Sequence, residues 1–322
     1  MSLLSMKSAI RPARSGLEFG KVAVLLGGDS TEREISLLSG NAVLEALTRR
    51  GVNAHAFDPQ SLPVGNLVSE GFDRVWIALH GPGGEDGAMQ GALEWLGIPY
   101  TGSGVLASAL TMDKLKTKRV VVGAGYVAPE YAVLSGPGDL KHALEHVGLP
   151  LMVKPASQGS SVGITKVKSA AELPHAYAEA RAVDPIVFAE AFVTGDEYTV
   201  GILHDSGLPS IRIQPATEFY DYQAKYFRDD TQYHCPSGLD PDTEAELQEA
   251  ALAAFRVTDC VGWGRVDFMR DGASGKFYFI EINTTPGMTG HSLVPMAARQ
   301  SGIDFDELVW RVLETSFLRE KK

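Results

Sequence analysis

Short apolar runs alternate with segments of helical periodicity in the first third of the chain. KVAVLLGG (residues 21–28), NAHAFDP (53–59) and RVWIALHG (74–81) predict strands. Residues 29–51 predict a helix with an apolar face formed by Ile35, Leu38, Val43, Leu44 and Leu47. GAMQGALEWLG (87–97) predicts another helix. This alternation predicts a parallel, helix-covered sheet with ligands at the carboxyl ends of its strands, where Glu32 and His80 fall.

Strands follow one another more closely in the rest of the chain. The predicted strands lie in PLMVKPASQGSSVGITKV (150–167, two strands and a loop), PIVFAEAFV (185–193), EYTVGIL (197–203), SIRIQPA (210–216), GWGRVDFMRD (262–271) and KFYFIEIN (276–283). Helices are expected to begin at Asp240-Pro241, where Asp is a cap, and at Asp304. The 322 residues exceed one ordinary core, so we expect two or three domains.

The strand KFYFIEIN carries two polar side chains in an apolar run. Strict alternation places Phe277, Phe279, Glu281 and Asn283 on one face. Arg265 and Asp267 likewise share a face, so a hairpin of the two strands would gather oxygen donors suited to Mg²⁺ beside an arginine. The alternative is the solvated polar side of an edge hairpin.

Three further segments are candidates for a nucleotide site. KPASQGSSVG (154–163) offers backbone N–H groups and a lysine for phosphate, although it could also be a plain hairpin loop. MDKLKTKR (112–119) offers three lysines on a short helix, and most such runs are solvated faces. FAEAFVTGDEYTV offers Glu190 and Glu197, which could equally be surface acids. The aromatic segment 215–238, which contains Lys225 and Tyr226, is expected to be a lid or an Ω-loop.

Composition narrows the classes of function. The net charge of -11 and the lack of a basic stripe argue against nucleic-acid binding, and no apolar run reaches a membrane span. The two cysteines, Cys235 and Cys260, lack the spacing of a zinc site and indicate idle thiols in a reducing compartment. Residues 1–19 are expected to be a disordered leader or an expression remnant, with a transit peptide as the alternative.

The joint order of these blocks resembles the ATP-grasp superfamily and, within it, the D-alanine–D-alanine ligases. The resemblance covers the chain from Lys21 onward and rests on blocks that include LLGGDSTEREIS, ALHGPGGEDG, KPASQGSSVG, FYDYQAKY, GWGRVDF, EINTTPGMT and HSLVPMAA. It implies a three-domain ATP-grasp fold of the α/β and α+β class. The implied domains are a parallel α/β domain over 20–102, a central domain over 103–195 and a C-terminal domain over 196–322, with ATP between the last two.

The resemblance also implies roles for particular residues. The implied nucleotide-binding residues are Lys114, Lys154, Ser161, Glu190, Ala191, Glu197 and Lys225, and the implied metal ligands are Asp267, Glu281 and Asn283. The implied catalytic residues are Glu32, Ser160, Tyr226, Arg265 and Gly287, and the implied substrate-binding residues are Glu32, His80, Arg265, Gly287, Ser292 and Leu293.

The implied reaction joins two D-alanines through a D-alanyl phosphate. It would use ATP with two Mg²⁺ ions, for which Mn²⁺ could substitute, in a homodimer of the bacterial cytoplasm, without nucleic-acid or membrane partners. Tyr226 favours the dipeptide over an ester. Gln158, Ala191 and Gly290 depart from residues common in the family. The alternatives are a ligase with another acceptor, a nucleotide-binding module without catalysis, and a dinucleotide oxidoreductase, which the absence of GxGxxG disfavours.

Overall fold

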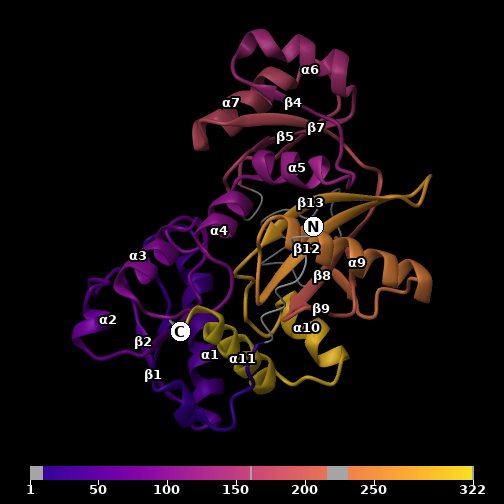
Figure 1. The fold of residues 1–322 in the computed structure, drawn as a ribbon. Coiled ribbons are helices and arrows are strands. Elements are labelled where there is room, and N and C mark those ends of the chain that lie inside the picture. Colours follow the sequence, from indigo (N-terminus) through magenta and orange to yellow (C-terminus); the bar gives the residue numbers. More distant parts are fainter. Residues whose placement is uncertain (1–9, 160–161, 216–230, 321–322) are drawn as a thin grey trace, which may run out of the picture.

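The computed structural model describes residues 10–159, 162–215 and 231–320, and three separate sheets organise this part of the chain (Figure 1). The first sheet is parallel, in the order β2-β1-β3, as predicted. Its elements are η1 (Gly16–Phe19), β1 (Lys21–Leu25), α1 (Arg33–Arg49), β2 (Asn53–Phe57), α2 (Asn66–Ser69), β3 (Arg74–Ile77) and α3 (Ala88–Leu96). Alternate residues of β1 pack in two cores, one with α1 and the other with α2 and α3. Both faces of the sheet are therefore buried.

Two expectations for this unit were wrong. Leu38 was expected on the apolar face of the first helix, but 60% of its surface is exposed. Residues 1–19 were expected to form a disordered leader or an expression remnant, yet the described part of that segment contains the 3-10 helix that ends at Phe19. The Phe19 ring is fully buried, edge-on to Trp310 and stacked on Phe317. The burial of one aromatic ring gives this segment a reason to order that its charge pattern does not reveal.

The second sheet is antiparallel, in the order β4-β7-β5-β6, and lies at the top of Figure 1. The elements of this part of the chain are α4 (Val105–Met112), α5 (Lys114–Gly123), β4 (Tyr131–Leu134), η2 (Pro137–Asp139), α6 (Leu140–Val147), β5 (Leu151–Pro155), β6 (Thr165–Val167), α7 (Leu173–Val183) and β7 (Val187–Ala191). The helix α5 lies between this sheet and β13 of the third sheet. It therefore joins two units.

The third sheet is antiparallel, with the order β11-β10-β8-β12-β13 and β9 paired to β8. Its elements are β8 (Gly195–Leu203), β9 (Ser206–Gly207), β10 (Ile211–Gln214), β11 (Gln232–His234), α9 (Pro241–Val257), β12 (Trp263–Asp271) and β13 (Phe277–Asn283). The side chain of Asp240 caps α9 by accepting a hydrogen bond from Thr243 N, as the sequence predicted. One face of the sheet packs against α9 through Leu247, Ala251, Ala254 and Phe255.

A β-bulge interrupts the pairing of β12 with β13. Asp267 pairs with Glu281, but the next residue, Phe268, pairs with Phe279, so Ile280 is the extra residue. Directly paired residues share a face. Phe279 therefore lies in the core against α9, whereas Glu281 lies on the opposite face. The expectation that the phenylalanines and the polar pair share one face was wrong, because an extra residue inverts the alternation.

The last elements return to the first unit. α10 (Leu293–Gln300) and α11 (Phe305–Glu314) precede η3 (Thr315–Arg319). Ion pairs join α11 to α1, with Arg49 2.7 Å from Asp306 and Arg50 paired to Glu307. Residues of the first and third units share one core with these helices. Within the described ranges, none of the helices combines the length and apolar character needed to cross a membrane.

Candidate active site

The face of the third sheet that points away from α9 carries most of the predicted metal and phosphate residues. The register places Arg265 opposite Asn283 and Asp267 opposite Glu281. Thr199 of β8 lies opposite Asp267 on its other side. The bulge thus brings two carboxylates, an amide and a guanidinium onto one surface, while the apolar residues of the same strands fill the core behind them.

Asp267 is held by two neighbours on this face. Arg265 donates to both carboxylate oxygens, from Nε at 2.9 Å and from Nη2 at 2.8 Å, and Thr199 Oγ1 donates at 2.6 Å. The Asp267 side chain is 4% exposed. Hydrogen bonds of this kind fix the carboxylate, and a bidentate guanidinium fixes its plane as well.

The N-terminus of α5 brings Lys114 to the same face. Its Nζ lies 3.1 Å from Glu281 Oε2 and donates to the carbonyl oxygen of Gln158 at 2.8 Å. The side chain of Asp113 caps this helix by accepting from Lys116 N. Lys114 therefore connects β13 with the Gly/Ser loop that follows β5. A phosphate bound between this strand and this loop would require a cation in that position.

A buried triad of charges lies beside this face. Glu190 of β7 is paired with Lys154, and Lys118 of α5 lies 3.0 Å from its other carboxylate oxygen. Glu190 is 2% exposed and Lys118 is 1% exposed. Burial by itself would raise the pKa of Glu190, but the two ammonium groups hold it below its ordinary value. Burial lowers the pKa of Lys118, and Glu190 opposes that change.

The first unit contributes Glu32, which precedes α1. A Cβ atom added to Gly159 would come within 2.9 Å of Glu32 Oε2, and one added to Gly81 within 2.8 Å. The carboxylate is therefore packed against the backbone of both loops. Gly159 belongs to the Gly/Ser loop of the central unit, so Glu32 lies where the first and second units meet.

The loop after β13 is joined to the first unit by hydrogen bonds. His80 is buried, and its Nε2 lies 3.2 Å from Ser39 Oγ, which accepts from Met288 N at 3.1 Å. Glu85 accepts from Thr285 Oγ1 at 2.8 Å. These contacts hold the segment that contains the predicted Gly287 against His80.

The predicted residues of the second-substrate pocket lie at the start of α10. Ser292 is the N-cap residue, and its Oγ accepts from Thr289 N at 2.9 Å. A Cβ atom on Gly287 would lie 2.9 Å from that same Oγ. Leu293 opens the helix and is buried. Gly287 and Ser292 are therefore neighbours, and a side chain at position 287 would displace the Ser292 hydroxyl.

The remaining predicted residues divide into two sets. Ala191 lies at the end of β7, where its N–H donates to the carbonyl of Glu130, and Glu197 lies on the polar face of β8 opposite Met269. Four predicted residues fall outside the described residues: Ser160, Ser161, Lys225 and Tyr226.

The polar face offers three oxygen-bearing side chains to a metal ion, those of Asp267, Glu281 and Asn283. No group of three or more His, Cys, Asp or Glu side chains in the described part of the chain could hold a metal ion. Two carboxylates and one amide nevertheless fit Mg²⁺, which usually takes one or two carboxylates and completes its shell with water and substrate phosphates. Asp267 and Glu281 are directly paired across the strands, and Lys114 marks the side from which phosphate would approach.

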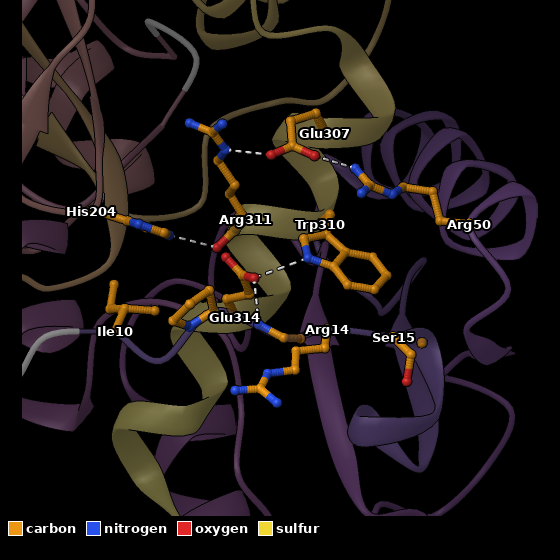
Figure 2. A pocket seen from close by; sticks show the side chains of 12 residues that line it. Ile10, Arg14, Ser15, Arg50, His204, Glu307, Trp310, Arg311 and Glu314 are labelled. Atoms are coloured by element: carbon orange, nitrogen blue, oxygen red, sulfur yellow. Dashed lines mark hydrogen bonds and ion pairs between the residues drawn. The ribbon is translucent and has the colours of Figure 1, made fainter.

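A pocket of about 700 Å³ lies elsewhere, between the first residues of the described chain and α11 (Figure 2). Glu314 accepts there from Ala13 N at 2.8 Å and from Trp310 Nε1 at 2.9 Å. Glu307 binds Arg311 and Arg50 in the same view. None of the predicted site residues lines this pocket. Its polar groups hold the N-terminal segment to the last helices.

Sequence reasoning missed three residues that organise the site, Ser39, Glu85 and Thr199, and did not separate Lys118 from the other lysines of its helix. Thr199 could have been found, because it is two positions from Glu197 in a predicted strand and therefore shares its face. Lys118 was one of three lysines on a short helix, and nothing in the helix distinguishes it from a solvated residue. Ser39 and Glu85 give no signal of their own.

Comparison with known proteins gives consistent matches over nearly the whole chain. The family models described as D-ala D-ala ligase N-terminus and D-ala D-ala ligase C-terminus match residues 60–103 and 125–314. The chain is 59% identical to the D-alanine--D-alanine ligase of Dechloromonas aromatica, over 92% of this chain and 97% of that protein. It is 57% identical to the ligase of the same name from Laribacter hongkongensis, over 92% and 96%.

A solved structure agrees with these matches. The D-alanine--D-alanine ligase of Bacillus anthracis complexed with ATP superposes with a TM-score of 0.81 at 32% identity, over 93% of this chain and 98% of that one. The predicted fold class, α/β and α+β in the ATP-grasp arrangement, is confirmed.

Proposed function

The chain belongs to the D-alanine–D-alanine ligase family, and from that premise we propose that it joins two molecules of D-alanine into D-alanyl-D-alanine while ATP is converted into ADP and phosphate. The product serves peptidoglycan precursor synthesis. The observation that carries the proposal is the polar face on which Arg265, Asp267, Glu281 and Asn283 gather beside Lys114. A module that only binds nucleotide has no need of so complete a set.

The chemistry of the reaction explains why such a face is needed. A carboxylate is a poor electrophile, so the first D-alanine is phosphorylated by ATP to D-alanyl phosphate. The neutral amine of the second D-alanine then attacks the acyl carbon and a tetrahedral oxyanion forms; its collapse breaks the acyl C–O bond, so phosphate leaves and the nitrogen gives up one proton. Charge develops on phosphoryl oxygens and then on the oxyanion. Catalysis therefore consists largely of positioning and electrostatic stabilisation.

Arg265 is suited to both charged stages. Its guanidinium keeps a fixed plane because Asp267 binds it through two hydrogen bonds. A preoriented cation costs no reorganisation when negative charge develops. The N–H of Gly287, in the loop joined to Ser39 and His80, is the proposed second donor to the oxyanion.

Lys114 and Lys154 are proposed to contact the phosphates, with Ser161 and Lys225 as further ligands. Glu190, Ala191 and Glu197 are proposed to line the adenine and ribose site. Lys154 is engaged by Glu190 here, so ATP would have to compete for its ammonium group.

Magnesium is proposed as the metal, held by Asp267, Glu281 and Asn283. When bound, it would neutralise the phosphate charge that faces these residues, and Mn²⁺ offers the same chemistry. The residues themselves supply hard oxygen donors on a rigid hairpin. Two ions are the family expectation.

Glu32 is proposed to bind the ammonium group of the first D-alanine, with His80 nearby and with Ser160 and Tyr226 completing the closure of the site. Ser292 and the Leu293 N–H are proposed to hold the second carboxylate. The Ser292 hydroxyl already accepts from Thr289, which orients it at the start of α10. Exclusion of water matters because the acyl phosphate is readily hydrolysed.

One assay tests the proposed function. Purified protein is incubated with MgATP and, in separate reactions, with D-alanine, L-alanine, D-serine and D-lactate, and release of ADP and phosphate is measured. We expect release with D-alanine and formation of the dipeptide. Equal release with L-alanine, or none with D-alanine, would overturn the proposal. A preference for D-serine or D-lactate as the second substrate would instead identify a ligase with another acceptor.

A homodimer of the bacterial cytoplasm is proposed as the working form. Three large apolar side chains on the neighbouring helices α3 and α4 support an interface there, because Trp95 is 92% exposed, Leu106 64% and Val105 37%. Light scattering of the intact protein and of Trp95→Glu tests this. A dimer that becomes a monomer supports the interface, and a wild-type monomer contradicts it.

A further inference from the structure

Lys118 is the most deeply buried lysine or arginine of the described chain, and the sequence offered it only as one of three lysines on a short helix near a nucleotide site. It lies on α5, is 1% exposed, and faces two units at once. Its Nζ lies 3.0 Å from Glu190 of the central sheet and donates to the carbonyl oxygens of Phe279 and Ile280 of the third sheet, at 3.2 Å each. Lys118 thus pairs with a carboxylate of one unit and donates to two backbone carbonyls of another.

Phe279 and Ile280 are the residues of the bulge. In a regular strand, consecutive carbonyl groups point in opposite directions, so a single nitrogen cannot reach both. A bulge leaves its extra residue outside the ladder and turns the backbone locally. β13 is the edge strand of the described sheet, and Phe279 N donates outward to the carbonyl of Val127, so the Phe279 carbonyl also faces away from β12. The bulge lets the Ile280 carbonyl turn to the same side, and both carbonyls need a donor outside the ladder. The ammonium group of Lys118 supplies that donor to both carbonyls.

The bulge in turn determines which face of the sheet carries the side chains of the proposed metal ligands. Glu281 follows Ile280 directly, and its pairing with Asp267 depends on the extra residue. Without the extra residue, the alternation would direct Glu281 and Asn283 toward the core that contains Phe279. Any group that stabilises the bulge therefore stabilises the polar face.

We propose that Lys118 is a positioning residue, whose ammonium group holds the bulge at Phe279 and Ile280 and thereby sets Glu281 and Asn283 on the metal-binding face. This inference deepens the proposed function and rests on it for the role of that face. Lys118 touches neither substrate nor metal in this assignment, and it acts through the backbone of β13.

A simpler role for Lys118 would be neutralisation of the buried Glu190 carboxylate. Lys154 already pairs with that carboxylate, whereas Lys118 is the side chain that donates to the two bulge carbonyls. The two roles predict different consequences. Loss of neutralisation alone would alter the nucleotide site around Glu190, and loss of the bulge contact would alter the response to magnesium.

The test compares Lys118→Met, Lys118→Arg and the control Lys116→Met with the parent enzyme. Lys116 lies on the same helix, but its side chain is 61% exposed and pairs with Asp113. Methionine fills the volume of lysine without its donors. Arginine keeps the charge beside Glu190, but its planar fork cannot reproduce the contacts of a compact ammonium group.

The first measurement is hydrogen exchange of the β13 segment, residues 277–283, in protein without nucleotide or metal. We expect exchange there to rise about tenfold in both Lys118 variants, with β1 unchanged and with Lys116→Met like the parent. The second measurement is the magnesium concentration that gives half-maximal ADP formation at saturating ATP. We expect it to rise about tenfold, as it does when groups that orient metal ligands are removed.

The outcomes separate the two roles. Unchanged exchange in β13 with an unchanged magnesium requirement, or wild-type behaviour of Lys118→Arg, would overturn the proposal in favour of neutralisation. If Lys118→Met does not fold, Lys118→Arg decides alone, because it keeps the charge. The exchange measurement needs no turnover, so it remains valid if the ligase assay contradicts the proposed function.

Discussion

Replacement of Glu281 by glutamine is expected to lower the activity that depends on the polar face while the fold stays stable. The change keeps the shape of the side chain and removes its negative charge. Glu281 lies 3.1 Å from Lys114, and the two side chains are 23% and 12% exposed. A partly exposed ion pair of this kind contributes about 1 kcal/mol or less. Since domains are commonly stable by about 5–15 kcal/mol, Glu281→Gln is expected to fold.

The expected effect on turnover is larger. Glu281 is directly opposite Asp267, and the proposed metal site has only these two carboxylates. Loss of one group that stabilises transition-state charge commonly lowers kcat by about 10²–10³-fold, or about 2.7–4 kcal/mol. We therefore expect a loss of at least about a hundredfold with less than about 1 kcal/mol of destabilisation.

The assay measures ADP release at saturating D-alanine over a magnesium series, together with thermal unfolding of the same preparation. The matched control is Glu249→Gln, at an exposed position of α9 away from the polar face. The control is expected to behave as the parent enzyme. Nearly full turnover of Glu281→Gln would refute the metal assignment, and a large loss of stability would show that the residue is mainly structural.

Three further predictions concern stability and reactivity. Glu314→Ala leaves two donors at the pocket of Figure 2 without an acceptor, so thermal unfolding should show a loss of about 1–3 kcal/mol. Burial raises the pKa of Cys260 to about 11 and, less strongly, that of Cys235, so mass spectrometry should find Cys235 alkylated first at pH 8 and Cys260 only after unfolding. The hydrogen bond from Arg33 lowers the pKa of Asp58, which therefore stabilises the fold above about pH 4 and loses that contribution as the pH falls through the folded-state pKa. The melting temperature of Asp58→Asn should consequently depend less on pH below pH 4 than that of the parent.

The sequence predicted most of the strands, whose periodicity is strong, but it did not predict the helices α4, α6, α7 and α10. The run 21–28 and the helix after it appear as β1 and α1, and the hairpin of β12 and β13 forms with the expected partners. The periodicity of apolar and polar residues was enough to predict an element where one of its faces is buried against a single neighbour. Leu38 shows the limit, since its spacing fits the helical face but its side chain is largely exposed among the described residues.

The arrangement of the polar face could not be read from spacing alone. One extra residue in β13 inverts every later side chain, and a single inserted residue leaves no periodic trace. A conflict was nevertheless visible in FYFIEIN, where strict alternation places two phenylalanines and a carboxylate on the same face. A face that carries both phenylalanines and a carboxylate costs free energy whether it is buried or solvated. This conflict is therefore a signal of a bulge.

Lys118 illustrates a different limit of prediction from sequence, because its role depends on partners that are distant in sequence. Lys118 lies 161 positions from Phe279, and Glu190 belongs to a different sheet. Within its own helix, Lys118 has the same local signature as Lys116, yet one is buried and the other exposed. A charge enters a protein interior only where several partners meet it. A lysine that is buried where two units join therefore marks a position at which their relative arrangement is fixed, and this position adjoins the residues proposed to bind the metal.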